Sequence, residues 1–201
     1  MKKILCYGDS NTYGYNPADC SRFDENIRWS GVLKNNLGIE YEIIEEGLCD
    51  RVGFSNNPKG FQYCAQRHFP KLLSKLSDIN TIILALGTND LQTQYDISFS
   101  NLEKGLEKLI LLSKEKSKQT IVISPVILNE KVLEGNFSFQ FDEMSIIKSR
   151  KIGRIYRQLA NIYGCTYIDI NKIAKPSDID GLHYDKSAHK IIADKLIQLI
   201  N

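Results

Sequence analysis

The sequence lacks the features of disulfide-bonded, zinc-binding and membrane-spanning proteins. Its five cysteines are odd in number, widely spaced and without a C-x-x-C pair, which argues against a disulfide framework and a cysteine zinc site. The apolar run after Lys3 ends at Gly8, too soon for the hydrophobic region of a signal peptide, and no later run is long enough to span a bilayer. We therefore expect a cytoplasmic protein that holds no metal and has no membrane anchor.

An excess of charge of either sign is also lacking. Lysine and arginine total 26, aspartate and glutamate total 24, and the basic residues are scattered along the chain. The resulting net charge of +2 indicates neither a nucleic-acid-binding surface nor a polybasic membrane patch. The length of 201 residues suits one domain over residues 1–201, since domains usually contain about 100–200 residues.

Short apolar or β-branched runs alternate along the chain with segments of helical periodicity. The predicted strands are Lys3–Gly8, Tyr41–Gly47, Thr81–Gly87, Thr120–Pro125 and Cys165–Ile170. The predicted helices are Trp29–Leu37, Pro70–Leu76, Phe99–Lys116, Asp142–Tyr163 and Lys186–Ile200, the last with Asp185 as its N-cap. This alternation predicts an α/β fold: a three-layer α/β/α sandwich with about five parallel strands in the flavodoxin-like order 2-1-3-4-5.

A serine follows the first predicted strand directly. In Gly8-Asp9-Ser10 the glycine permits a sharp turn, and Ser10 can begin a helical turn with its backbone N–H directed to the sheet edge where open α/β sheets bind ligands. This is a suitable position for a nucleophile, although the sequence is not the G-x-S-x-G elbow of α/β-hydrolases. For this motif alone, a helix-capping cluster is an equally good interpretation.

A histidine stands three residues after an aspartate just before the last predicted helix. In Asp180-Gly181-Leu182-His183 the carboxylate can accept a hydrogen bond from the imidazole, which leaves the other ring nitrogen for the serine. Taken alone, the motif favours a surface turn with Gly181 at positive φ. The other histidines, His68 and His189, lie in helical stretches and are weaker candidates.

Donors for an oxyanion are expected at two further strand ends. Asn89 follows the apolar strand that ends at Gly87, and its side-chain amide can donate to an oxyanion together with the backbone N–H groups of Gly47 and Ser10. By itself Gly87-Thr88-Asn89-Asp90 is also an ordinary polar turn, in which Asp90 has a structural role.

The combined pattern resembles the SGNH hydrolases, also called GDSL esterases, over the whole chain. Ser10, Gly47, Asn89 and His183 match the four sequence blocks of that family in order. The resemblance implies that Ser10 is the nucleophile, His183 the base and Asp180 its partner, and that Ser10, Gly47 and Asn89 form the oxyanion hole.

Two further segments, 28–33 and 45–51, resemble the arylesterase and acyltransferase branch of the family. This chain differs at Asn11, where the family often has leucine, and at Cys49 and Asp50, where it often has a small residue.

Several residues near these motifs are candidates for a substrate pocket. The expected pocket residues are Asp9, Asn11, Tyr13, Tyr15, Trp29 and Phe139. The alternating aromatics at 137, 139 and 141 fit a pocket lid, an oligomer contact or plain core burial, so a homo-oligomer stays open. Arg51 is expected to pair with a nearby carboxylate such as Glu46, and Cys49 lacks a local base that would make it a nucleophile.

The sequence therefore predicts a serine esterase for small carboxylic esters. It would act through an acyl-enzyme on Ser10 without a cofactor, and transfer of the acyl group to an alcohol is a further expected activity. A thioesterase or lysophospholipase and a sugar O-deacetylase remain alternatives, because pocket shape decides among them. An alternative from another class is a flavodoxin-like module that binds a phosphate or nucleotide after Ser10, against which the carboxylate of Asp9 argues.

Overall fold

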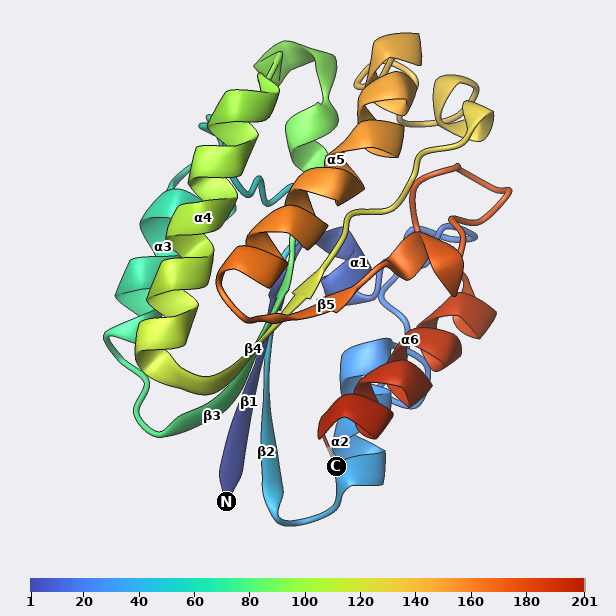
Figure 1. Cartoon of the computed structure of the whole chain (residues 1–201). Helices are drawn as coiled ribbons and strands as arrows, with labels where there is room; N and C mark the ends of the chain where they lie inside the picture. Colours follow the sequence, from blue (N-terminus) through green and yellow to red (C-terminus); the bar gives the residue numbers. More distant parts are fainter. Residues whose placement is uncertain (201) are drawn as a thin grey trace.

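The computed structural model describes residues 1–200, which form a single sheet of five parallel strands with helices on both faces (Figure 1). The strands are β1 (Lys2–Gly8), β2 (Tyr41–Gly47), β3 (Ile79–Ala85), β4 (Ser117–Ile123) and β5 (Thr166–Ile168). Their order in the sheet is β2-β1-β3-β4-β5, as predicted from the alternation of strands and helices. Gly8 at the end of β1 pairs with Gly47 of β2 and with Ala85 of β3, so these three strands end side by side.

The helices form two outer layers. They are α1 (Ser10–Tyr13), α2 (Trp29–Leu37), α3 (Ala65–Leu73), α4 (Phe99–Lys116), α5 (Glu143–Ile162) and α6 (Lys186–Ile200). Helices α3, α4 and α5 pack side by side on one face, while α2 and α6 pack together on the other, and α1 lies at the carboxyl end of β1 (Figure 1). Short 3-10 turns cover Phe61–Tyr63, Asn89–Leu91, Thr93–Tyr95, Glu130–Leu133 and Ile170–Lys172.

Helix α3 begins five residues earlier than predicted, at Ala65 instead of Pro70. Proline is common at the first helical position and uncommon inside a helix. In the structure Ala65, Phe69 and Leu73 are spaced by four residues and all are buried. The packing of this apolar stripe outweighs the local cost of a proline inside the helix.

Strands β3 and β4 begin two or three residues before the predicted runs, and β5 is shorter than predicted. The polar residues at the start of β4, from Ser117 to Gln119, extend the pairing with β3 although the apolar run begins only at Thr120. Strand β5 lies at the sheet edge and pairs only with the last three residues of β4, which limits it to Thr166–Ile168. Apolar sequence runs therefore located these strands but not their ends.

The core lies on both faces of the sheet. Leu5, Ile82 and Val122 on the three central strands are fully buried, as are Leu33 of α2 and Leu109 of α4.

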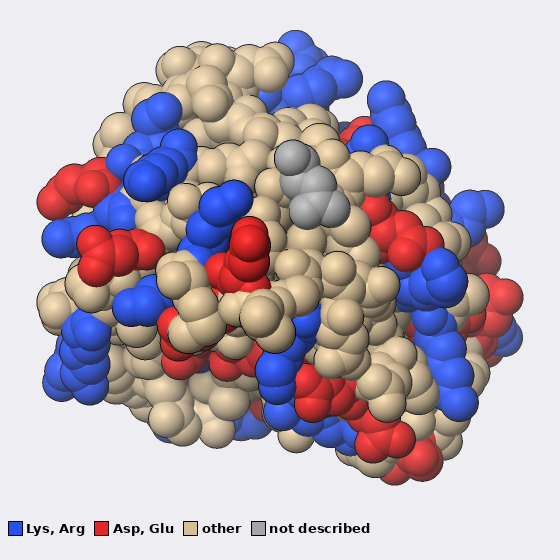
Figure 2. Space-filling model, turned by 90° about the horizontal axis from the view of Figure 1, so that it is seen from below, with Lys and Arg blue, Asp and Glu red and all other residues tan. Residues whose placement is uncertain are grey.

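Basic and acidic side chains are interspersed on the face seen from below, which carries the amino ends of the strands (Figure 2). Within residues 1–200, no helix is long and apolar enough to cross a membrane.

Two helical glycines provide a matched test of the packing. A Cβ at Gly31 of α2 would lie 2.2 Å from the backbone oxygen of Glu25, whereas the nearest atom to a Cβ at Gly153 of α5 is 3.6 Å away. We predict that Gly31→Ala lowers the free energy of unfolding by about 1–3 kcal/mol through overpacking. Gly153→Ala should raise it by about 0.5–1 kcal/mol, because alanine favours the helix. Urea unfolding measures both, and equal effects would contradict the packing described for α2.

Candidate active site

Three side chains form a continuous line of hydrogen bonds at the carboxyl edge of the sheet. His183 Nε2 lies 2.9 Å from Ser10 Oγ, and His183 Nδ1 lies 2.6 Å from Asp180 Oδ2. Because an ionised carboxylate can only accept, Nδ1 carries the ring proton and Nε2 is left to accept from the Ser10 hydroxyl. Ser10 is 8% exposed and His183 only 2%, so the line is almost closed to solvent. The structure thus brings together the three residues that the sequence motifs selected.

The Asp180 carboxylate orders the loop that carries the histidine. Its Oδ1 accepts hydrogen bonds from the backbone N–H groups of Leu182 (3.0 Å) and His183 (2.9 Å). Burial alone would raise the pKa of Asp180, but the hydrogen bonds and charge of His183 and the N–H of Leu182 lower it below its ordinary value. Gly181 has a φ of +68°, and a Cβ there would lie 2.3 Å from Asn129 Oδ1, so the turn requires glycine.

Ser10 begins the short helix α1. The Asp9 side chain caps this helix by accepting from the Asn11 N–H at 3.0 Å, and Gly14 ends it in the left-handed conformation. A Cβ at Gly8 would lie 2.6 Å from the backbone oxygen of Ala85, so glycine allows β1 to turn directly into α1. The Ser10 N–H makes no hydrogen bond to another described residue and faces the open first turn.

Asn11 and Trp29 have structural roles, which corrects their assignment to a substrate pocket. Asn11 Nδ2 donates to the Leu182 carbonyl at 3.2 Å, and Asn11 Oδ1 accepts from the Tyr184 N–H at 3.1 Å. These bonds join α1, which carries Ser10, to the loop that carries His183. The Trp29 indole is buried and donates to the Asn11 carbonyl at 3.1 Å. Both side chains are therefore used to align Ser10 with His183.

The Asn89 amide belongs to the 3-10 turn that follows β3. Its Nδ2 donates one hydrogen to the Arg51 carbonyl at 3.1 Å, and its Oδ1 accepts from Gln92 Nε2 at 3.1 Å. The second Nδ2 hydrogen has no partner among the described residues and is available to an oxyanion. The next residue, Asp90, is fully buried and accepts from the backbone N–H groups of Gly53, Phe54 and Ser55, as its expected structural role requires.

The strand pairing corrects the assignment of Gly47 as an oxyanion donor. The Leu48 N–H donates to the Gly8 carbonyl, and in a parallel ladder alternate residues face the partner strand, so the Gly47 N–H points away from β1. A Cβ at Gly47 would lie 2.2 Å from the Tyr13 backbone nitrogen. Glycine is therefore required here because α1 packs directly on the end of β2.

Asp50 offers the backbone donor that Gly47 does not. The Arg51 N–H donates to the Leu48 carbonyl at 3.2 Å, which closes a turn in which Asp50 has a φ of +62°. The Asp50 N–H makes no hydrogen bond to any other described residue. Sequence reasoning missed this residue, although the small residue that related sequences often have at this place is a signal for positive φ.

Arg51 supports the strand ends beneath the turn, as its expected structural role implied. Its guanidinium is buried, donates to the backbone oxygens of Gly8 (3.0 Å) and Glu46, and lies 4.4 Å from the centre of the Tyr7 ring. Its Nη2 is 3.6 Å from a Glu46 carboxylate oxygen. Because Arg51 holds β1 and β2 together, it is not free to bind an anionic substrate.

Two aromatic rings cover the histidine. The ring centre of Tyr15 lies 4.2 Å from that of His183, and the ring centre of Phe137 lies 5.2 Å from it. Tyr15 is thus beside the site as predicted. Phe139 is 78% exposed and Phe141 is buried in the core, so the residue of this loop that contacts His183 is Phe137. The Tyr13 ring packs on the guanidinium of Arg22.

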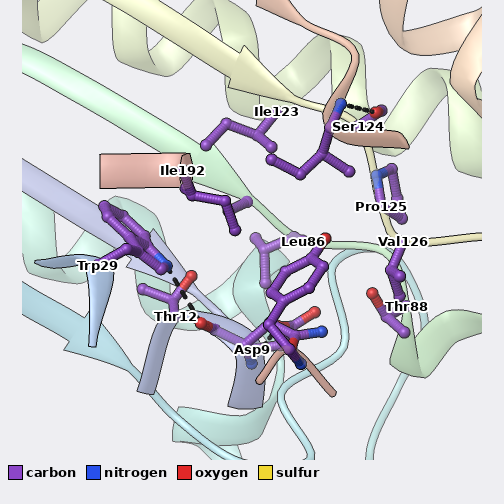
Figure 3. A pocket seen from close by; sticks show the side chains of 14 residues that line it. Asp9, Thr12, Trp29, Leu86, Thr88, Ile123, Ser124, Pro125, Val126 and Ile192 are labelled. Atoms are coloured by element: carbon purple, nitrogen blue, oxygen red, sulfur yellow. Dashed lines mark hydrogen bonds between the residues drawn. The ribbon is translucent and has the colours of Figure 1, made fainter. Parts of the chain in front are cut away.

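A small cavity lies beneath the turn that carries Ser10, between α1, β3 and β4 (Figure 3). It encloses about 20 Å³, enough for one water molecule, and Asp9, Thr12, Trp29 and Thr88 line it. Burial raises the pKa of Asp9 to about 7, against the lowering effect of the hydrogen bonds from Asn11 and Thr88. Asp9 is therefore a buried support of the turn that carries Ser10 and not part of an open substrate pocket.

Cys49 is poorly suited to act as a nucleophile. Burial, together with the charges of Asp50 and Asp9, raises the pKa of its thiol to about 11. Within residues 1–200, no three histidine, cysteine, aspartate or glutamate side chains are grouped so that they could hold a metal ion.

The sequence model of the GDSL-like lipase/acylhydrolase family matches residues 6–191, a range that includes Ser10, Asn89 and His183. The chain belongs to this family. No curated protein matches the sequence. Among solved structures, an aryl esterase from M. smegmatis is 25% identical, with a TM-score of 0.90, and the match covers 100% of this chain and 98% of that protein.

A second solved structure is a carbohydrate acetylesterase family member from Sinorhizobium meliloti. It is 27% identical, with a TM-score of 0.89, and the match covers 100% of this chain and 97% of that one. The chain is thus a member of the GDSL-like lipase/acylhydrolase family with an α/β fold, and its solved relatives include proteins described as esterases of two kinds.

The buried Asp9 and His189 are expected to affect stability in opposite directions as the pH changes. His189 is fully buried, and burial lowers its pKa to about 4, so the unfolded chain binds the extra proton and stability rises with pH between about 4 and 6.5. The raised pKa of Asp9 means that the folded chain binds the extra proton, so stability falls with pH between about 4 and 7.

We predict that Asp9→Asn removes the second effect while its amide oxygen still caps α1. The difference in free energy of unfolding, variant minus wild type, should therefore increase with pH by up to about 1.4 kcal/mol per pH unit between about pH 4 and 7. Urea unfolding of both proteins across this range measures the difference, in which contributions from other residues cancel. A difference that does not change with pH would show that Asp9 does not titrate in this range.

Proposed function

We propose that this chain is a serine esterase that cleaves esters of short acyl groups through a covalent acyl-enzyme on Ser10. The observation that carries the proposal is the buried line of hydrogen bonds from Asp180 through His183 to Ser10 Oγ. A serine hydroxyl is a weak nucleophile until a base takes its proton, and the base needs a partner that fixes its tautomer. His183 is the candidate base for Ser10, and Asp180 is the candidate partner that fixes the tautomer of His183; each lies at hydrogen-bond distance from the group it would act on.

In acylation, Ser10 Oγ attacks the ester carbonyl carbon while its proton moves to His183 Nε2. The carbonyl π electrons move onto the oxygen and form a tetrahedral oxyanion, and Asp180 stabilises the imidazolium. When the oxyanion collapses, the bond from carbon to the alcohol oxygen breaks and His183 returns the proton to the leaving alcohol. In deacylation, water repeats these steps with His183 again as base and releases the acid and free Ser10.

We assign the oxyanion hole to the N–H groups of Ser10 and Asp50 and the free amide hydrogen of Asn89. These donors have no other hydrogen-bond partner among the described residues and belong to the ends of β1, β2 and β3. Donors that are fixed before the reaction stabilise the developing negative charge without reorganisation. The fixed position of Asn89 follows from its bonds to Arg51 and Gln92.

The aromatic contacts of His183 support a short acyl group. Tyr15 and Phe137 also contact one another, with ring centres 6.1 Å apart, so they form an aromatic wall next to the base. Such a wall excludes water, and it limits the length of chain that can lie beside the reacting carbonyl. Esters of acetate to butyrate are the substrates this wall favours. The aryl esterase and carbohydrate acetylesterase among the solved relatives are in keeping with small esters.

Substitutions at Ser10 and Asn89 test the proposed roles. Ser10→Ala should lower kcat for p-nitrophenyl acetate by several orders of magnitude, and Asn89→Ala should lower it roughly 10²–10³-fold with a smaller change in KM. Cys49→Ala is the control and should keep most of the activity. Thermal unfolding shows whether each variant is folded. Activity above about one per cent in folded Ser10→Ala would exclude Ser10 as the nucleophile.

The aromatic wall predicts a different acyl-length profile for Phe137→Ala. The wild type should be fastest with acetyl to butyryl esters and slower with octanoyl, because a longer chain meets the wall. Each methylene that can be buried contributes about 0.8 kcal/mol, so Phe137→Ala should shift the maximum of kcat/KM to longer esters. Phe139→Ala is the matched control and should leave the profile unchanged. A wild-type rate that still rises at dodecanoyl would contradict the short-acyl proposal and favour a thioesterase or lysophospholipase.

A further inference from the structure

A pocket of about 340 Å³, lined mainly by residues with hydrogen-bonding side chains, adjoins the proposed oxyanion hole at Asp50. One wall is the 3-10 segment that follows Asn89, with Gln92, Gln94 and Tyr95, and the opposite wall is the segment 50–59. The loop that carries Phe139 and Gln140 closes the third side. This volume lies at the lower end of the range for small-molecule sites, which is roughly 300–1,000 Å³.

Hydrogen bonds connect both walls of this pocket to Asn89. Gln94 Nε2 donates to Gln92 Oε1 at 2.6 Å, and Gln92 Nε2 donates to Asn89 Oδ1 at 3.1 Å. On the other wall, Asp50 lies next to Arg51, whose carbonyl accepts from Asn89 Nδ2 at 3.1 Å. The pocket is therefore lined by Asp50, whose N–H we assign to the oxyanion, and is joined to Asn89 through Gln92.

The third side of the pocket is continuous with the cover of the catalytic histidine. The loop from Phe137 to Gln140 contacts His183 through the Phe137 ring, and the Gln140 carbonyl accepts from the Thr93 N–H at 2.9 Å. A substrate whose alcohol oxygen lies at His183 Nε2 can thus extend along this loop into the pocket.

The pocket presents neutral hydrogen-bonding groups that have no protein partner. Among the described residues, no hydrogen bond engages the Gln140 amide, the Tyr95 hydroxyl or Gln94 Oε1. The charged residues in the lining, Lys59 and Asp50, are paired with each other at 2.5 Å, so their charges cancel. An alkyl chain would leave the amide and hydroxyl groups unpaired, which costs free energy, and an anion would find no unpaired cation.

We propose that this pocket binds the hydroxyl-rich alcohol part of the substrate, a single sugar ring that carries the short acyl ester. Sugar hydroxyls both donate and accept, so each can pair with an amide, a phenol or a carboxylate oxygen. The exposed Phe139 ring offers a flat apolar surface for the C–H groups of such a ring. This inference rests on the proposed esterase function, since it assigns the alcohol side of that reaction.

The test compares two acetate esters that differ mainly in hydroxyl groups, 6-O-acetylglucose and hexyl acetate. The wild type should have the higher kcat/KM for 6-O-acetylglucose. In Gln140→Leu, the ratio of the two kcat/KM values should fall about five- to tenfold, because a lost hydrogen bond costs about 1–1.4 kcal/mol. Tyr95→Phe, which removes one hydroxyl only, should lower the ratio severalfold. Gln158→Leu on the exposed surface of α5 is the matched control and should change neither rate.

Saturation-transfer NMR of 6-O-acetylglucose binding to the Ser10→Ala protein tests the pocket without catalysis. We expect binding that Gln140→Leu weakens and Gln158→Leu does not. If Ser10→Ala binds the sugar ester but the wild type hydrolyses neither acetate, the esterase proposal fails while the pocket assignment stands. An unchanged ratio in both pocket variants, or a Gln140→Leu protein that gains activity only on octanoyl esters, would overturn the assignment; the second result would place the acyl chain in the pocket.

Discussion

The Asp180 carboxylate is the group on which the rest of the proposed site depends. One of its oxygens holds the backbone of residues 182 and 183, and the other holds the imidazole proton of His183. A buried carboxylate with fewer partners would take up a proton, but these donors keep its pKa low and its charge in place. The orientation of the ring, and with it the hydrogen bond to Ser10, follows from this single anchored side chain.

The sheet supplies the second requirement, which is that separate segments meet at one edge. Strands β1, β2 and β3 end beside one another, and glycines at Gly8 and Gly47 remove the side chains that would separate α1 from these ends. The buried Arg51 then joins β1 to β2 through their carbonyl groups. Ser10, Asp50 and Asn89 therefore hold their relative positions through backbone packing, and the loops around them are free to determine the substrate.

Sequence patterns predicted the strand order and selected Ser10, Asp180 and His183, which lie together in the structure, because both depend on local signals. Ser10 follows a strand, and Asp180 and His183 share one short loop, so their proximity needs only the parallel sheet. The backbone donor that follows β2 was harder to predict. The N–H direction alternates along a strand, and a motif match does not say which residue of a turn faces the site. This is why Gly47 was chosen in place of Asp50.

The pocket was the least predictable part for a related reason. Alternation of aromatics made Phe137 and Phe139 equal candidates for a pocket lid, but only Phe137 contacts His183. Trp29 was expected beside the substrate because aromatic residues often line pockets, yet it is buried and holds the nucleophile helix. The row of amides from Gln94 to Asn89 depends on side-chain contacts that no sequence period encodes.

Covalent labelling tests the central claim, that His183 and Asp180 activate Ser10 as a nucleophile, most directly. The wild-type protein should react with a fluorophosphonate probe to give one adduct by intact mass, which peptide mapping should locate at Ser10. His183→Ala should react far more slowly, and Ser10→Ala should not react at all. An adduct at another residue such as Cys49, or esterase activity in a protein that the probe does not label, would contradict the account.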